Sequence, residues 1–207
     1  MNVEILLGFI LATAALSISP GPDNIFVLTQ SMVNGKRYGL ATVVGLMTGC
    51  LMHTSLLAFG VSTIIKNNAT IFLIIKLLGV IYLLYLSFMV FKSDSTIELH
   101  KVALEQSVFN LFKKGFVMNV LNPKVTIFFL AFFPGFLFSK TMHTVVQFYI
   151  LGFLFIAVSF IIFSTIAILA GSISNYILKT PKTGFILKWL QIVVFVGIVI
   201  YLLLTDR

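Results

Sequence analysis

Apolar stretches of about 20 residues recur along the whole chain and constrain its fold more than any other feature. A helix needs about 20 apolar residues to cross a hydrocarbon core of roughly 30 Å. Of the 207 residues, 59% are hydrophobic and only 10% are charged, whereas a soluble domain needs about a quarter. We therefore expect an all-α membrane protein with six transmembrane helices. The expected spans are 4–33, 39–65, 69–91, 115–138, 144–173 and 184–204.

Proline interrupts the first and the fourth of these spans. Pro22 and Pro123 lie 101 residues apart, and an ionisable residue follows each. Proline lacks an amide hydrogen, so each break frees backbone groups, which a membrane tolerates only beside protein or a wet cavity. Paired interrupted helices are typical of a transporter site near the midplane. The sequence predicts one transporter domain, 1–207, made of two inverted three-helix repeats, about 1–91 and 115–207, joined by a loop at about 92–114.

The two breaks carry the charges that lie deepest within apolar sequence, Asp23 and Lys124. A lone charge at a helix centre costs about 2.5–3.5 kcal/mol on insertion scales. A facing pair would offset part of this cost and offer opposite charges to a zwitterion. The structural alternatives are that Asp23 only caps the restarted helix, where the macrodipole favours an anion, and that Lys124 only snorkels. Ser19 and Asn122 are expected to cap the broken ends.

Gly45, Gly49 and His53 share one face of the second span, because residues four apart lie on the same side of a helix. Small residues at this spacing let another helix approach closely, so we expect the two glycines to pack against protein, within one chain or in a homodimer. His53 is either a packing residue or a titrating group that carries a coupling proton. The phenylalanines of 128–136 are expected in the core or against lipid. Cys50 is the only cysteine, which excludes an intrachain disulfide.

The basic residues predict the orientation in the membrane. If the connection after the first span is cytoplasmic, nine Lys and Arg residues lie inside and four outside, so the positive-inside rule puts both termini outside. Because these charges separate apolar segments, the net charge of +8 does not indicate nucleic-acid binding. The inside set is Lys36, Arg37, Lys92, Lys101, Lys113, Lys114, Lys179, Lys182 and Lys188; the outside set is Lys66, Lys76, Lys140 and Arg207.

Other classes of membrane protein fit the sequence less well. An intramembrane enzyme would need a motif such as His-Glu-x-x-His, and none is present, so we expect no enzyme and no cofactor. A metal-cation or other small-solute exporter remains the alternative. A metal exporter would require several carboxylates or histidines within the spans, and only Asp23 and His53 are found there. No metal site is predicted.

Three motifs resemble those of the amino-acid exporters of the LysE/RhtB family. They are Ser-Pro-Gly-Pro at 19–22, Gly-x3-Gly-x3-His at 45–53 and Asn-Pro-Lys at 122–124, and the length and six-span layout also match. The resemblance implies a bacterial inner-membrane exporter of amino acids or derivatives such as homoserine, homoserine lactone, threonine, leucine or lysine, driven by protons and working by alternating access. The expected substrate-binding residues are Pro20, Gly21, Pro22, Asp23, Asn122, Pro123 and Lys124, with Asp23 or His53 carrying the proton.

Overall fold

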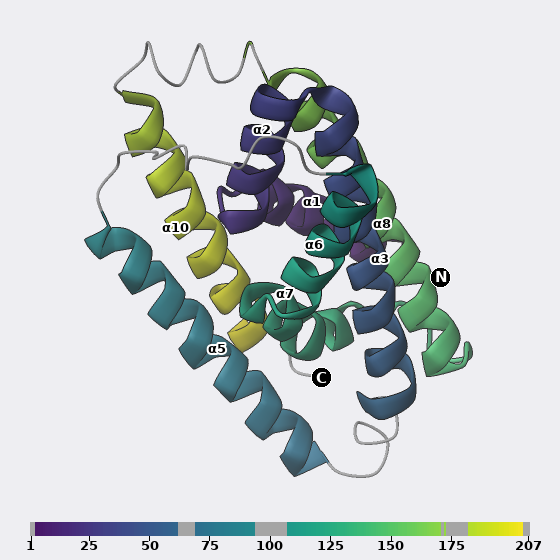
Figure 1. Cartoon of the computed structure of the whole chain (residues 1–207). Coiled ribbons are helices and arrows are strands. Elements are labelled where there is room, and N and C mark those ends of the chain that lie inside the picture. Colours follow the sequence, from purple (N-terminus) through teal and green to yellow (C-terminus); the bar gives the residue numbers. More distant parts are fainter. Residues whose placement is uncertain (1–2, 62–68, 94–106, 171, 173–181, 205–207) are drawn as a thin grey trace.

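The computed structural model describes residues 3–61, 69–93, 107–170, 172 and 182–204. Every regular element in this part of the chain is a helix, as Figure 1 shows. Lys66, Lys101, Lys179 and Arg207, which the charge count used, lie outside the described residues. In chain order the elements are α1 (Val3–Ile18), α2 (Pro22–Asn34), α3 (Lys36–Leu56) with the π-helical turn η1 (Leu57–Val61), α5 (Ala69–Lys92), α6 (Val108–Val120), α7 (Pro123–Ile127), the π turn η2 (Phe128–Phe132), the 3-10 turn η3 (Phe133–Phe136), α8 (Thr144–Ile168) and α10 (Lys182–Leu204).

Four of these helices are each long and apolar enough to cross a membrane, namely α3, α5, α8 and α10. Two further spans are bent pairs. The axes of α1 and α2 differ by 59°, and those of α6 and the α7–η3 segment differ by 49°. Counting each pair as one span gives six, which confirms the predicted all-α membrane protein.

The fourth span begins earlier than the sequence indicated. The loop was predicted to extend from about 92 to about 114, but α6 already begins at Val108. The predicted end of this loop is therefore wrong. The Ser107 hydroxyl accepts a hydrogen bond from the backbone N–H of Asn110 at 3.1 Å, an N-cap that starts the helix despite two lysines in its second turn. The break at Asn122 consequently falls near the middle of the span, as the break after Ile18 does in the first span.

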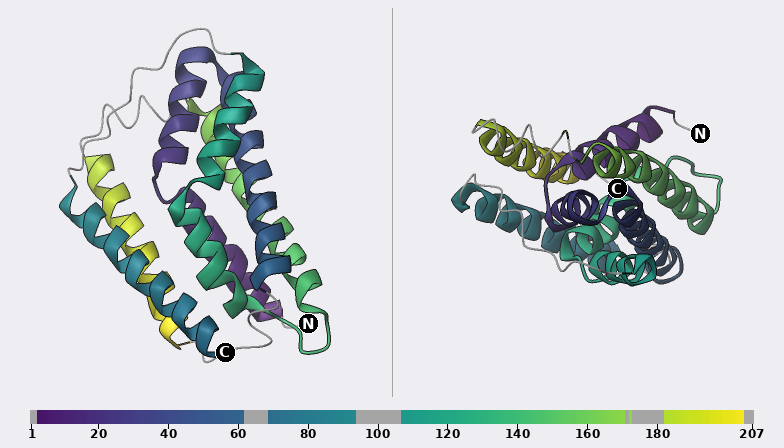
Figure 2. Two further views of the ribbon diagram at one scale, coloured as in Figure 1. Left: turned by 60° about the horizontal axis from the view of Figure 1, so that its bottom comes forward. Right: turned by 45° about the horizontal axis from the view of Figure 1, so that its top comes forward.

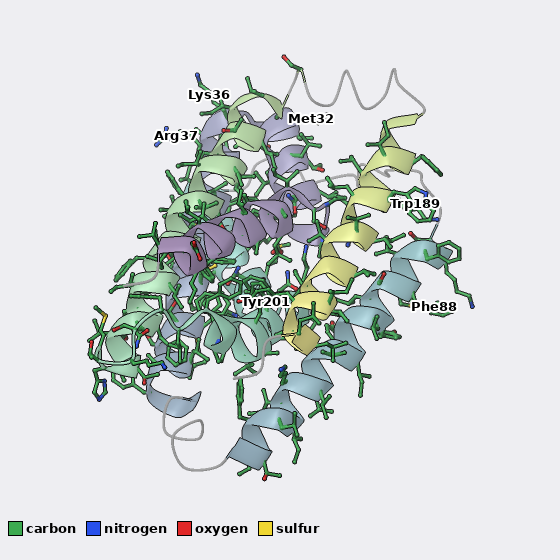
Figure 3. All side chains as sticks on the ribbon, turned by 180° about the vertical axis from the view of Figure 1, so that it is seen from behind. Met32, Lys36, Arg37, Phe88, Trp189 and Tyr201 are labelled. Atoms are coloured by element: carbon green, nitrogen blue, oxygen red, sulfur yellow. The ribbon has the colours of Figure 1, made fainter. Side chains whose placement is uncertain are left out.

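α3 is the centre of the helical packing, because it contacts α6, α8 and α2. α5 and α10 lie side by side along one flank of this bundle (Figure 1). The start of α1 and the end of α10 lie at the same end of the molecule (Figure 2, left). The α2–α3 turn lies at the opposite end, where Lys36 and Arg37 project outward (Figure 3).

The α3–α6 contact is a backbone contact made possible by glycine. A Cβ at Gly45 would collide with the carbonyl oxygen of Phe112, and a Cβ at Gly115 would collide with that of Thr42. A Cβ at Gly49 would come within 2.6 Å of Asn119 Oδ1. The glycine face therefore packs within this chain. Close approach of this kind replaces the hydrophobic driving force that is missing between helices in lipid.

The phenylalanines of 128–136 form the core rather than a lipid-facing surface. Phe128, Phe129, Phe132, Phe133 and Phe136 are each at most 2% exposed. Their rings contact one another, and further rings from α1 and α8 join the cluster. This cluster supports the irregular turns η2 and η3 directly after the second break, and it fixes the position of α7.

Candidate functional site

Both breaks restart a helix at a proline. α2 begins at Pro22 and α7 at Pro123, the position where the missing proline N–H costs nothing. Asn122 caps α7 as expected, because its side-chain oxygen accepts from the N–H of Lys124 at 3.0 Å. The prediction that Ser19 is a cap is wrong. Its backbone N–H still donates to Ala15 in the last turn of α1, and its hydroxyl has no hydrogen-bond partner among the described residues.

Each break is hydrogen-bonded to the other, although they lie about 100 residues apart. Asn122 Nδ2 donates to Asp23 Oδ2 at 2.8 Å, and Lys124 Nζ lies 3.4 Å from the carbonyl oxygen of Ser19. A helix end leaves carbonyl groups without helical partners. At the end of α1, Lys124 satisfies one of these carbonyls and Asn24 Nδ2 donates to another, that of Ser17, at 2.7 Å.

A small cavity of about 40 Å³ lies between the two breaks and is lined by residues of α1, α2, α3, α6, α7 and α8. Its wall combines charge, amide and hydroxyl groups with apolar side chains. The polar lining is Ser17, Asp23, Asn24, Cys50, Asn119, Asn122, Lys124 and Ser159; the remaining lining is Leu16, Gly21, Pro22, Leu46, Met47, Val125, Phe155 and Phe163.

A larger cavity, of about 320 Å³, lies between α1 and α10. Its lining contains no ionisable side chain except Tyr201, whose hydroxyl donates to the carbonyl of Gly135 (Tyr201 is labelled in Figure 3). Size alone would favour this cavity. The smaller cavity is the functional candidate, because recognition depends on a few placed polar groups and these groups line only the smaller of the two.

Asp23 and Lys124 both line the small cavity. Asp23 is 8% exposed, and it is not the cap of α2, since Gly21 holds that position and α2 has no side-chain cap bond. Lys124 does not extend along the helix toward the membrane surface. Its Nζ lies beside Ser19 and 5.3 Å from the centre of the Phe195 ring. Both charges therefore point into the protein.

The remaining residues predicted for the site divide into two groups. Gly21, Pro22 and Asn122 line the cavity with the two charges, whereas Pro20 and Pro123 form the breaks and are not among its lining residues. His53 is also absent from this lining. It is 6% exposed, its Nε2 lies 3.2 Å from the backbone oxygen of Asn119, and its ring packs 5.4 Å from that of Phe129.

Several polar residues of the cavity were not predicted from the sequence. Ser17 of α1 and Ser159 of α8 are joined by a hydrogen bond of 2.9 Å between their hydroxyl oxygens. They lie 142 residues apart, and no sequence signal pairs them. Asn119 could have been found, because it lies one helical turn before Asn122 and is the only other amide within the predicted span 115–138. In the described part of the chain, no group of three or more His, Cys, Asp and Glu side chains is placed to hold a metal ion.

These observations define a class: a multi-pass membrane protein in which two broken spans meet at a charged, buried cavity. The family model described as LysE type translocator matches residues 14–206, so the chain belongs to this family, which confirms the resemblance of its motifs. The homoserine/homoserine lactone efflux proteins of Salmonella typhimurium (strain LT2) and Salmonella typhi are each 34% identical over 182 residues, 88% of this chain and 87% of theirs. A Vibrio cholerae protein described as an uncharacterized membrane protein is 26% identical over 88% of both chains. No solved structure matches.

Proposed function

We propose that this protein is a proton-coupled secondary exporter of amino acids or close derivatives across the bacterial cytoplasmic membrane. The observation that carries the proposal is that a carboxylate, Asp23, and an ammonium, Lys124, come from two different broken helices and line one buried cavity. A zwitterion needs both charges. The named activity of the two Salmonella relatives favours homoserine, which is a zwitterion, and its lactone, which keeps only the ammonium, within this class.

In this proposal the substrate carboxylate binds beside Gly21 and Lys124. α2 is a helix of 13 residues whose first turn has no side-chain cap, and the free N–H groups and dipole at such a helix end attract anions. Gly21 lies directly beside the lysine, because a Cβ there would be in ordinary van der Waals contact with Lys124 Nζ, at 3.6 Å. The substrate ammonium then binds to Asp23.

Transport requires that the two breaks separate. A cavity of about 40 Å³ has room for a few water molecules but not for an amino acid. We propose that the halves, about 1–91 and 115–207, form the two inverted repeats of one transporter domain and rock about the site. The bonds from Asn122 to Asp23 and from Lys124 to Ser19 join these halves, so they would break and re-form in each transport cycle.

We assign the coupling proton to Asp23 rather than His53. Asp23 lines the cavity and has one carboxylate oxygen without a hydrogen-bond partner among the described residues. His53 contacts α6 backbone and a phenylalanine ring, an environment that suits packing. His53→Gln should therefore leave the pH dependence of efflux unchanged. If efflux by this variant depends less on pH than efflux by the wild type, the coupling proton is carried by His53.

The decisive experiment is efflux of homoserine, threonine, leucine and lysine from preloaded cells, together with resistance to toxic metal cations. Asp23→Asn and Lys124→Gln should each abolish amino-acid efflux while membrane insertion persists. Glu4→Gln and Lys140→Gln, at exposed positions, are the matched controls and should transport normally. Normal efflux by Asp23→Asn would refute the role of the carboxylate, and metal resistance without amino-acid efflux would favour the alternative exporter class.

The proposed orientation has both termini on the periplasmic side. Among the described residues, Lys36, Arg37 and the first two turns of α6 bring positive charge to the end of the molecule opposite the start of α1 (Figures 2 and 3). The positive-inside rule makes this end cytoplasmic. Reporter fusions after residue 207 should be active only with a periplasmic reporter, and activity with a cytoplasmic reporter would invert the assignment.

A further inference from the structure

Asn119 contributes an unused acceptor to the cavity. Its side chain lines the cavity and is only 3% exposed. Its Oδ1 is buried and has no hydrogen-bond partner among the described residues. A buried polar atom without a partner is costly, so such an atom beside a cavity indicates a ligand that supplies the missing donor.

The position of this amide is fixed from three sides. Asn119 Nδ2 donates to Cys50 Sγ at 3.4 Å. The backbone oxygen of Asn119 is held by His53 Nε2 at 3.2 Å and by the backbone N–H of Asn122 at 3.0 Å. Gly49 provides the space that the side chain fills, because a Cβ there would lie 2.7 Å from the Cβ of Asn119. The unused oxygen is thus held in place without being satisfied.

Asp23 supplies a second unused acceptor to the same cavity. Its Oδ2 accepts from Asn122, but its Oδ1 is buried without a hydrogen-bond partner in the described part of the chain. Both residues line the same cavity, and Asn122 bonds to the Asp23 side chain and to the Asn119 backbone. Two acceptors without donors, one of them a carboxylate, match a group that has several N–H donors and a positive charge.

We propose that Asn119 Oδ1 and Asp23 Oδ1 form an oxygen-lined subsite for a primary ammonium group, so that Asn119 selects free amines over acylated ones. The inference rests on the proposed function, because it assigns one end of the exported amino acid. An ammonium carries three N–H donors and satisfies both oxygens. An N-acylated amine is neutral and has a single N–H, which leaves one of the two oxygens unpaired.

The test measures competition in proteoliposomes that contain the full-length protein. Homoserine, threonine and leucine are each compared with the derivative acetylated at the α-amino group, and lysine is compared with the derivative acetylated at both amino groups. Wild-type protein should bind the free form of at least one of them at least about tenfold more tightly than the acetylated form. Asn119→Leu, which keeps the volume but lacks the acceptor, should weaken this preference, although the Asp23 carboxylate remains: the free form weakens by about tenfold and the acetylated form is unchanged within about twofold.

Two further variants make the result specific to the subsite. Asn110→Leu, at an exposed position of the same helix, should keep the wild-type preference. Asn119→Asp keeps an acceptor oxygen at this position and should retain the preference even if Asn119→Leu does not fold. A purely structural role for Asn119 would weaken both forms of the substrate equally, so an unchanged ratio in Asn119→Leu, or a lost ratio in Asn119→Asp, would overturn the subsite.

The failures of the two proposals are distinguishable. If wild-type protein binds none of the free amino acids, the proposed function fails and the subsite fails with it. If wild-type protein binds and exports an amino acid but accepts its acetylated form equally well, only the subsite fails. The subsite also fails, and the proposed function does not, under one further result. If substrate binding is lost when choline replaces Na⁺ in the medium, and the free and acetylated forms compete equally, the two oxygens hold an inorganic cation.

Discussion

The backbone contact between α3 and α6 predicts a large effect of a single methyl group at Gly45. Gly45→Ala would place a Cβ against the carbonyl oxygen of Phe112. Backbone on the facing helix cannot rotate away as a side chain can, so we assign about 3 kcal/mol, the upper part of the usual range for overpacking. The better helix propensity of alanine returns about 1 kcal/mol. The net expectation is a loss of about 2 kcal/mol.

The measurement is thermal unfolding of the purified protein in detergent. For a chain of this size, a loss of about 2 kcal/mol lowers Tm by roughly 4–8 °C. Gly197→Ala is the matched control, because a Cβ at Gly197 would meet no atom within 4 Å, and it should raise Tm slightly or leave it unchanged. Equal Tm values for the two variants would show that α3 and α6 do not approach as closely as described, and the geometry of the cavity between them would then be wrong too.

Three further substitutions test the surroundings of the site. Asn122→Ala removes both the cap of α7 and the bond to Asp23; it should cost about 1–2 kcal/mol and abolish efflux. Asn122→Asp keeps a capping oxygen but places a second carboxyl group beside Asp23, so it should also abolish efflux. Phe195→Leu removes the ring beside Lys124 and should weaken substrate binding about fivefold, with Phe195→Trp restoring it, since cation–π contacts contribute roughly 1 kcal/mol. Gln147→Leu should lower the free energy of unfolding by about 2 kcal/mol, measured by thermal unfolding, because this side chain makes four hydrogen bonds to the backbone of 138–142.

The sequence was sufficient for the parts of this protein that depend on local composition. An apolar run long enough to cross a bilayer predicts a span wherever it is placed in the fold, and a proline interrupts the helix that contains it. The six spans and both breaks therefore follow from the residues alone. Boundaries were less certain: the start of α6 depends on the Ser107 cap, a single hydrogen bond within a polar stretch that hydropathy assigns to a loop.

The site was predicted only where the sequence itself marks a position as unusual. Asp23 and Lys124 are charges within apolar spans, and such charges indicate function because they are costly. Ser17, Cys50 and Ser159 are ordinary residues of membrane helices, and nothing in the sequence separates them from serines and cysteines that face lipid or pack in the core. Ser19 was predicted as a cap, but its backbone N–H donates to Ala15 at the end of α1 and its hydroxyl has no hydrogen-bond partner among the described residues.

The sequence by itself determined the helices, their breaks and the charges at the breaks, because these depend on each segment alone. Only the tertiary structure decided which residues share the cavity, because that depends on the rotation of each helix and on contacts between distant segments. The bonds from Asn122 to Asp23 and from Ser17 to Ser159 join residues 99 and 142 positions apart. His53 shows the same dependence on tertiary structure. Its place in the sequence allowed either packing or proton transfer, whereas in the structure it contacts Asn119 and Phe129 and does not line the cavity.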